Sequence, residues 1–421
     1  MKITRKSTLL LLIAVLMLMI GCSSEPEIDN AALRSEAFNL LVETVKTGSL
    51  DERKETYNTA TGLRDAIAVE IIKISTEDQD KEIAEKSMQK ITLLKQPSTK
   101  DMIRKKLGDG FDQISIEALI EFGADDLDEN IEKGLKSLRP NERAAAVELL
   151  GKYQKEQAAD RIREYLNDEE LIVRIKAIHA LGRLGDKTAI EKVGDLFKED
   201  NIIAKAGAVA IAEDLDRREY EPQIVDVARN SATIIAIEAL RVLYEWKNEE
   251  ASDILLEKIN TKDMMSFYTY LKLVDDNKDR KALDKLREFT SSANPQERYS
   301  AARVYVSIDP DSSPDILDFL LRGMDSDIDK VREQVAILLG NLPGIEKVKT
   351  TLIEIGLKDQ SASVVKSSII ALGKIGDQST LKILSPFMRD TNSINRIVAS
   401  AAILNILDRI EGKTDIETED K

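Results

Sequence analysis

The chain has 421 residues, a formal net charge of −15 at pH 7, one cysteine and one histidine. The negative charge argues against nucleic acid as a partner, because phosphate binding requires a basic surface. A single cysteine and a single histidine exclude an intrachain disulfide and a thiolate or multi-histidine metal centre, so we expect neither a metal nor another cofactor.

The first residues have the pattern of an export signal. Lys2, Arg5 and Lys6 precede an apolar run over residues 9–20. The run is too short to span a bilayer as a stable helix, and small residues follow it. We therefore predict a signal peptide over residues 1–21.

The end of this signal is similar to a bacterial lipobox, with the sequence Met19-Ile20-Gly21-Cys22, although Met19 stands where leucine is usual. The resemblance implies that cleavage leaves Cys22 as an acylated N-terminus, followed by a tether over residues 22–30. The expected location is then a membrane, reached through lipid, and with Ser23 after the cysteine the outer membrane rather than the inner one if the cell has two. An ordinary cleaved signal or an uncleaved anchor is the alternative.

The next segment, residues 31–108, has the apolar spacing of helices but no regular period. We interpret it as an N-terminal helical region, with degenerate repeats that cap the array behind it, because the end units of an array need a polar outer face. Gly108-Asp109-Gly110 marks its end.

From residue 109 to 410 the chain repeats one unit, seen in the matching segments 168–186 and 359–377. Each copy has a turn aspartate, a helix that begins near Val-Arg, then Ala-Leu-Gly or a similar triplet, and a Gly-Asp turn. The arginine of this helix serves as a register mark, and the marks recur at intervals of 31 to 34 residues. The marks are Arg143, Arg174, Lys205, Ala236, Phe267, Arg298, Arg332, Val365 and Arg396.

A period near 30 predicts an all-α fold, an α-solenoid in which each unit buries its apolar face against its neighbours. Positions three, four and seven after the mark lie on one helix face and should form the core, as Ala177, Ile178 and Leu181 do in one copy. A second amphipathic segment follows each marked helix, so each unit should contain two helices. Residues 411–421 should be a disordered acidic tail.

The unit resembles HEAT repeats, of the short HEAT-like, armadillo-like type also found in phycobilisome lyases. Val173-Arg174, Ala180-Leu181-Gly182 and Gly185-Asp186 carry the resemblance best. It implies a superhelix of stacked helical hairpins, in which a turn aspartate and a helix arginine link successive units. Several marks are not arginine, so a continuous ladder is not expected.

The sequence contains no catalytic constellation, and we predict that the protein is not an enzyme. Some HEAT-repeat enzymes resemble this fold and carry paired His-Glu motifs for two irons, but the only histidine here is His179, and no His-Glu pair exists. We expect His179 to be an exposed surface residue.

Aromatic residues are concentrated in the central units, where the register predicts a candidate binding strip. Tyr268 and Tyr299 take the slot one after the mark, which we expect to face away from the core, and Arg241, Lys272 and Arg303 lie one turn beyond that slot. If the marked helices line the concave surface, these residues would bind a partner, because Tyr and Arg supply much of the energy at interfaces. Alternatively, the apolar residues pack on neighbouring helices and the bases stay solvated.

Three functional hypotheses follow. The first is a membrane-anchored scaffold or adaptor that binds another protein of the bacterial cell envelope. The second is a lyase-like enzyme or a protein that handles a small ligand, as the phycobilisome relatives do. The third is a structural spacer between membrane and wall.

Overall fold

The computed structural model describes residues 28–259, 263–311 and 314–413, and this part of the chain is helical without strands. The predicted signal peptide, Cys22 and residues 414–421 of the predicted tail lie outside it. Among the described helices, none combines the length and the apolarity needed to cross a membrane.

Helices follow one another around the whole described chain. Their bounds are α2 (Asn30–Thr47), α3 (Leu50–Ala60), α4 (Asp65–Ser75), α5 (Lys81–Leu94), α6 (Lys100–Leu107), α7 (Gln113–Glu121), α8 (Asp128–Leu135), α9 (Pro140–Gln154), α10 (Ala159–Glu164), α11 (Leu171–Arg183), α12 (Lys187–Lys198), α13 (Ile202–Asp214), α14 (Glu221–Asn230), α15 (Thr233–Glu245), α16 (Ala251–Lys258), α17 (Met264–Asp276), α18 (Leu283–Phe289), α19 (Pro295–Ile308), α20 (Pro314–Arg322), α21 (Asp329–Leu339), α22 (Glu346–Glu354), α23 (Ala362–Ile375), α24 (Gln378–Leu384) and α25 (Ser393–Ile410).

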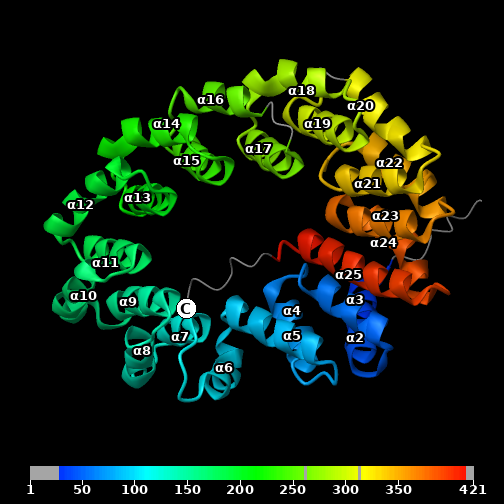
Figure 1. Cartoon of the computed structure of the whole chain (residues 1–421). Helices are drawn as coiled ribbons and strands as arrows, with labels where there is room; N and C mark the ends of the chain where they lie inside the picture. Colours follow the sequence, from blue (N-terminus) through cyan, green and yellow to red (C-terminus); the bar gives the residue numbers. More distant parts are fainter. Residues whose placement is uncertain (1–27, 260–262, 312–313, 414–421) are drawn as a thin grey trace, which may run out of the picture.

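The helices form a two-layered ring (Figure 1), and the predicted α-solenoid is confirmed. From α9 to α25 the odd-numbered helices make the inner layer and the even-numbered helices the outer layer. All nine register marks fall on these inner helices, so the marked helices line the concave surface, as the sequence analysis assumed. The predicted core positions are also confirmed, because Ala177, Ile178 and Leu181 are all buried.

The Gly-Asp turn explains how one helix reverses into the next. Gly185 has a φ of +82°, a left-handed conformation that glycine adopts without a steric penalty. The amide of Asp186 then donates to the carbonyl of Leu181 at 3.0 Å, which closes the end of α11. The Asp186 carboxylate accepts from the amides of Thr188 and Ala189 and caps α12.

The glycine of the Ala-Leu-Gly triplet sets the distance between inner helices. A Cβ on Gly373 would lie 2.8 Å from both Cα and Cβ of Ala402 on the next inner helix, and one on Gly340 would lie 2.8 Å from the Cα of Ala371. The neighbouring backbone cannot give way as a side chain can. The absence of a side chain at these positions therefore allows close packing of successive units.

We expect Gly373→Ala to lower the free energy of unfolding by about 1–3 kcal/mol, because the added methyl group overpacks the contact with Ala402. Gly151→Ala is the matched control, since its Cβ would meet the Ala180 Cβ at 3.2 Å. There the better helix propensity of alanine, up to about 1 kcal/mol, should offset the tighter contact. Urea denaturation measures both, and equal stability of the two variants would contradict this account.

Isolated ion pairs replace a continuous ladder between units. Arg143 makes two hydrogen bonds to Asp168, both 3.1 Å long, and Arg332 makes two to Asp359, at 2.7 and 2.9 Å. The Arg332 guanidinium lowers the pKa of Asp359. Arg174 instead donates to backbone carbonyls, including that of Asp168 at 2.8 Å. The ladder is thus also interrupted at a mark that is arginine, whereas the sequence predicted interruptions only where the mark is another residue.

An arginine–aspartate pair of the same kind lies in the N-terminal helical region. Arg53 of α3 makes hydrogen bonds of 2.8 and 3.1 Å to Asp78, and its Nη1 donates to the carbonyl of Gly48. Arg143 makes the equivalent bonds to Asp168 and to the carbonyl of Ser137. The local geometry around Arg53 is therefore that of a unit of the array.

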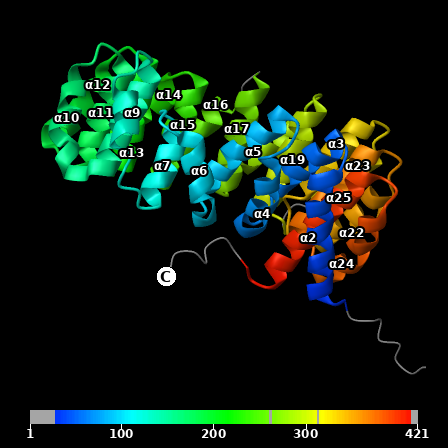
Figure 2. The ribbon, with the colours of Figure 1, turned by 90° about the horizontal axis from the view of Figure 1, so that it is seen from below.

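The two ends of the array meet and close the ring. Helix α25 packs against both α2 and α3 (Figures 1 and 2), and buried residues of α2 share one hydrophobic core with those of α25. These include Leu33, Ala37, Leu41, Leu404 and Leu407. We call this contact the seam. The prediction that the N-terminal region caps the array with a polar outer face is wrong. Apolar packing between α2 and α25 covers this end of the array.

Polar contacts surround the apolar seam. The nearly buried carboxylate of Asp408 accepts from Arg34 Nη1 at 2.6 Å and from Arg64 Nε at 3.3 Å. The side-chain amides of Asn30 and Gln378 bond to each other in both directions, at 3.1 and 3.0 Å. These bonds join residues from opposite ends of the chain and fix the register of the seam.

Candidate partner-binding face

The five residues predicted to form a binding strip lie on three successive inner helices, α15, α17 and α19. The structure brings them to the inner layer but does not leave all of them free. The exposure and the partners of each residue decide what this part of the face can bind.

Arg241 on α15 is half-exposed, but carboxylates occupy its guanidinium. Its Nη1 and Nη2 donate to the two carboxylate oxygens of Glu213 at 2.5 and 2.6 Å, and its Nε donates to Glu238 at 3.0 Å. The hydrogen bonds to Glu213 raise the pKa of Arg241 further. A partner carboxylate would have to displace one of these acids.

Tyr268 and Lys272 on α17 are exposed, as predicted. The ring of Tyr268 is 37% exposed and packs edge-on against Phe267, with 5.9 Å between ring centroids, and partial burial raises its pKa. Lys272 pairs with Asp276 on the same helix at 2.5 Å, an exposed pair that contributes little energy. Of the five predicted residues, Lys272 is the most accessible, with 72% of its side chain exposed.

The expected exposure of Tyr299 is wrong. Only 8% of this residue is exposed, and its ring stacks on Phe319 of α20, with 5.2 Å between centroids and 13° between planes. Ile175 in the same register slot is also buried, and a Cβ on Gly207 of the next inner helix would meet it at 2.6 Å. At Tyr299 and Ile175 the slot one after the mark therefore points towards the neighbouring unit, whereas Tyr268 in the same slot stays exposed.

Arg303 on α19 is also largely covered, with 14% of its side chain exposed. It forms an ion pair with Asp275 of the preceding unit, and the hydroxyl of Ser307 donates to the same carboxylate at 2.6 Å. Burial acts to raise the pKa of Asp275, but hydrogen bonds from Ser307, Lys278 and Arg303 outweigh it, and the pKa is lowered. Arg303 thus links units together.

His179 is not the exposed surface residue that the sequence suggested. Only 12% of its side chain is exposed, and its Nε2 lies 2.9 Å from Asp214 Oδ2, while Arg183 donates to the same carboxylate at 2.6 and 2.8 Å. Burial lowers the pKa of His179 against the opposing effect of Asp214. The histidine belongs to a charge network that joins α11 to α13.

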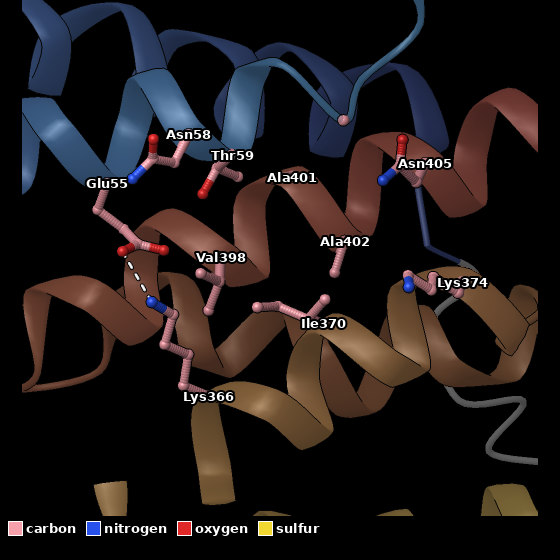
Figure 3. A pocket seen from close by; sticks show the side chains of 11 residues that line it. Glu55, Asn58, Thr59, Lys366, Ile370, Lys374, Val398, Ala401, Ala402 and Asn405 are labelled. Carbon is pink, nitrogen blue, oxygen red and sulfur yellow. Dashed lines mark hydrogen bonds and ion pairs between the residues drawn. The ribbon is translucent and has the colours of Figure 1, made fainter. Parts of the chain in front are cut away.

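The seam forms a pocket that the sequence analysis missed (Figure 3). It has a volume of about 370 Å³ and is lined by α3, α23 and α25. Ile370, Val398, Ala401 and Ala402 form its apolar part, and Lys374 lies near Asn405 at one end. At the other end, in Figure 3, Lys366 donates to Glu55 at 2.7 Å across the seam.

Two further pockets adjoin it and share residues with it. One has a volume of about 350 Å³ and runs from Ile370 to Ile337 on α21. The other has a volume of about 410 Å³ and runs from Lys374 to Arg409 near the end of α25 and to Lys413 beyond it. Together we call the three pockets the seam groove. A sequence signal existed for part of it, because the slot five after the mark is charged or polar in all but one of the preceding units, where it is Ala210, and changes to isoleucine at Ile337 and Ile370.

Within the described residues, no group of three or more His, Cys, Asp or Glu side chains is placed to hold a metal ion. The seam groove is lined by lysines, arginines, amides and hydroxyl groups, and its three carboxylates, Glu55, Glu333 and Asp408, each pair with a cation. The remaining cations suit recognition of an anion.

A comparison with protein-family models agrees with the fold. A family model described as HEAT repeats matches residues 129–212 and 317–406, and these two regions are HEAT repeats. A search of curated proteins found no match.

Similar solved structures include a Kap121p mutant, with 12% identity, a TM-score of 0.41, and coverage of 89% of this chain and 50% of that one. This chain thus spans half the length of that protein. Human deoxyhypusine hydroxylase in complex with glycerol has 21% identity, a TM-score of 0.26 and coverage of 62% and 99%. An engineered protein has 16% identity, a TM-score of 0.28 and coverage of 88% and 98%.

Proposed function

We propose that this protein is a non-catalytic scaffold, anchored to a membrane of the bacterial cell envelope through a lipid on Cys22, that binds another envelope protein on its inner face. The observation that carries the binding part of the proposal is the seam groove, where two exposed isoleucines lie beside a lysine that has no acidic partner among the described residues. Such a surface is costly to leave in water and typical of an interface.

The sequence at the N-terminus supports the location. A basic start, an apolar run and a single cysteine directly after it are the features that a lipid-anchored exported protein requires. In a cell with two membranes, Ser23 favours the outer membrane. The same features make a cytoplasmic partner unsuitable, so the proposed partner is a protein of the envelope.

Photocrosslinking in intact cells tests the proposed face. A photoreactive amino acid at Tyr268 or Ile370 on the inner face should crosslink one recurrent protein, identified by mass spectrometry. The matched control is Lys198 on outer helix α12, whose side chain is 78% exposed. The same proteins from all three positions, or none from the inner face, would contradict the proposal.

A further inference from the structure

We infer that the seam groove binds an extended, acidic polypeptide segment that carries apolar side chains. The inference rests on the proposed function and deepens it, because it assigns the partner's chemistry and its place on the inner face. Three observations carry it: an excess of cations, an exposed apolar floor, and an open groove that runs across successive helices.

Cations are in excess at one end of the groove, although the whole protein has a net charge of −15. Lys374, Arg409 and Lys413 lie around the third pocket. Lys374 has no ion-pair partner among the described residues, and Arg409 donates to the carbonyls of Gly373 and Gly376 rather than to a carboxylate.

The acids near this end are already engaged. Asp408 accepts from Arg34 and Arg64, and Glu411 pairs with both Arg34 and Lys413. The local field is therefore positive in an acidic protein, which draws a negatively charged partner to this place.

The apolar floor runs away from these cations along the inner face. Ile370 is 39% exposed and Ile337 is 48% exposed, and both occupy the same slot of adjacent inner helices. Adjacent packed helices lie about 8–10 Å apart. An extended chain in the polyproline II conformation has three residues per turn and rises about 3.1 Å per residue, so side chains three residues apart lie on one face about 9 Å apart and match this spacing.

The shape of the groove favours a polypeptide over other anions. Lys374 lines all three pockets and Ile370 lines two of them, so the pockets form one open run rather than an enclosed cavity. They lie on the concave face, which a flat membrane surface cannot contact. A nucleic acid backbone would leave the two isoleucines without apolar partners.

Both ends of the chain line the groove, so binding and ring closure are linked. Asn58, Thr59 and Gly62 come from the N-terminal side, whereas Ile370 and Ala402 come from the C-terminal side. A segment that contacts both sides binds the closed ring and stabilises it by mass action. Closure therefore completes the site.

Fluorescence polarisation with a labelled synthetic peptide tests the inference. The probe, acetyl-Ile-Ser-Ser-Ile-Ser-Asp-Glu-Asp, places two isoleucines three residues apart before an acidic end. We expect saturable binding that weakens with added salt, and about tenfold weaker binding by Lys374→Gln/Lys413→Gln, equivalent to 1.4 kcal/mol. The control Lys136→Gln/Lys198→Gln removes the same charge from exposed lysines elsewhere, at 79% and 78% side-chain exposure, and should bind normally.

Ile370→Ser should also weaken binding of the probe, and a second probe with lysines in place of the acids should not bind. Absence of saturable binding, or equal affinity for all variants, would overturn the inference. Tighter binding after neutralisation of Asp415, Glu417, Glu419 and Asp420 would assign the groove to the chain's own acidic residues and overturn the partner assignment. In each case a recurrent crosslink from Tyr268 would leave the proposed scaffold function standing.

Discussion

Replacing Asp408 with alanine is expected to lower the free energy of unfolding by about 2–4 kcal/mol. Asp408 is 5% exposed and accepts from Arg34 and Arg64, so its removal leaves the partly covered guanidinium group of Arg64 without its carboxylate and that of Arg34 with Glu411 alone. Because the three residues hold the seam together, the ring should also open more often. Chemical denaturation measures the stability loss, and small-angle X-ray scattering measures the accompanying increase in radius of gyration.

Asp318→Ala is the matched control for this prediction. Asp318 also forms an ion pair with a residue of a neighbouring unit, Lys347, but both side chains are exposed, at 44% and 61%. Exposed pairs of this kind contribute about 0–1 kcal/mol. If the two alanine variants lose similar stability, the carboxylate at the seam has no special part in closing the ring.

Replacing Cys22 with serine is expected to move the protein from the membrane fraction to the soluble fraction. Serine provides no thiol for acylation, and each buried methylene of a lipid chain contributes about 0.8 kcal/mol to membrane binding. Metabolic labelling with a clickable fatty acid should label the protein that has Cys22 and leave the Cys22→Ser variant unlabelled.

Ser23→Ala keeps the thiol and serves as the control for labelling and for membrane association. Continued membrane association of an unlabelled Cys22→Ser protein would instead identify the apolar run over residues 9–20 as an uncleaved anchor. In that event the scaffold would still be tethered, but by its own chain.

The register of one unit was enough to predict the fold between residues 109 and 410. Leu181 and its equivalents recur at a fixed distance from each mark because every unit buries the same face against its neighbours. Pro314, which fits the first turn of a helix, does begin α20. Such features depend only on residues close in sequence, and the sequence therefore reveals them.

The candidate site was harder to predict, because exposure depends on the angle at which neighbouring units pack. The slot of Tyr299 and Ile175 lies at the border between the core face and the inner face, and a small rotation of the helix decides its exposure. Phe319 of α20 covers Tyr299, a contact that no helical period encodes. The strip predicted from the register therefore lost the tyrosine on α19, the last of its three helices.

The seam was beyond prediction from a single sequence. Arg34 and Asp408 are 374 residues apart, and nothing in the local pattern of either pairs them. The irregular period of residues 31–108 also concealed the unit around Arg53. Residues from both sides of the seam line the seam groove, so the groove could not be predicted without the seam.

A closed ring fixes the number of its units in a way that an open solenoid does not. An open array can gain or lose a copy by duplication or deletion of a gene segment, since each unit contacts only its neighbours. Here an added copy would change the angle and offset at which α2 and α3 reach α25, and the bonds of Asp408 would be lost. Closure thus converts a modular architecture into one whose length is constrained, and in-frame repeat expansion should be selected against in this chain.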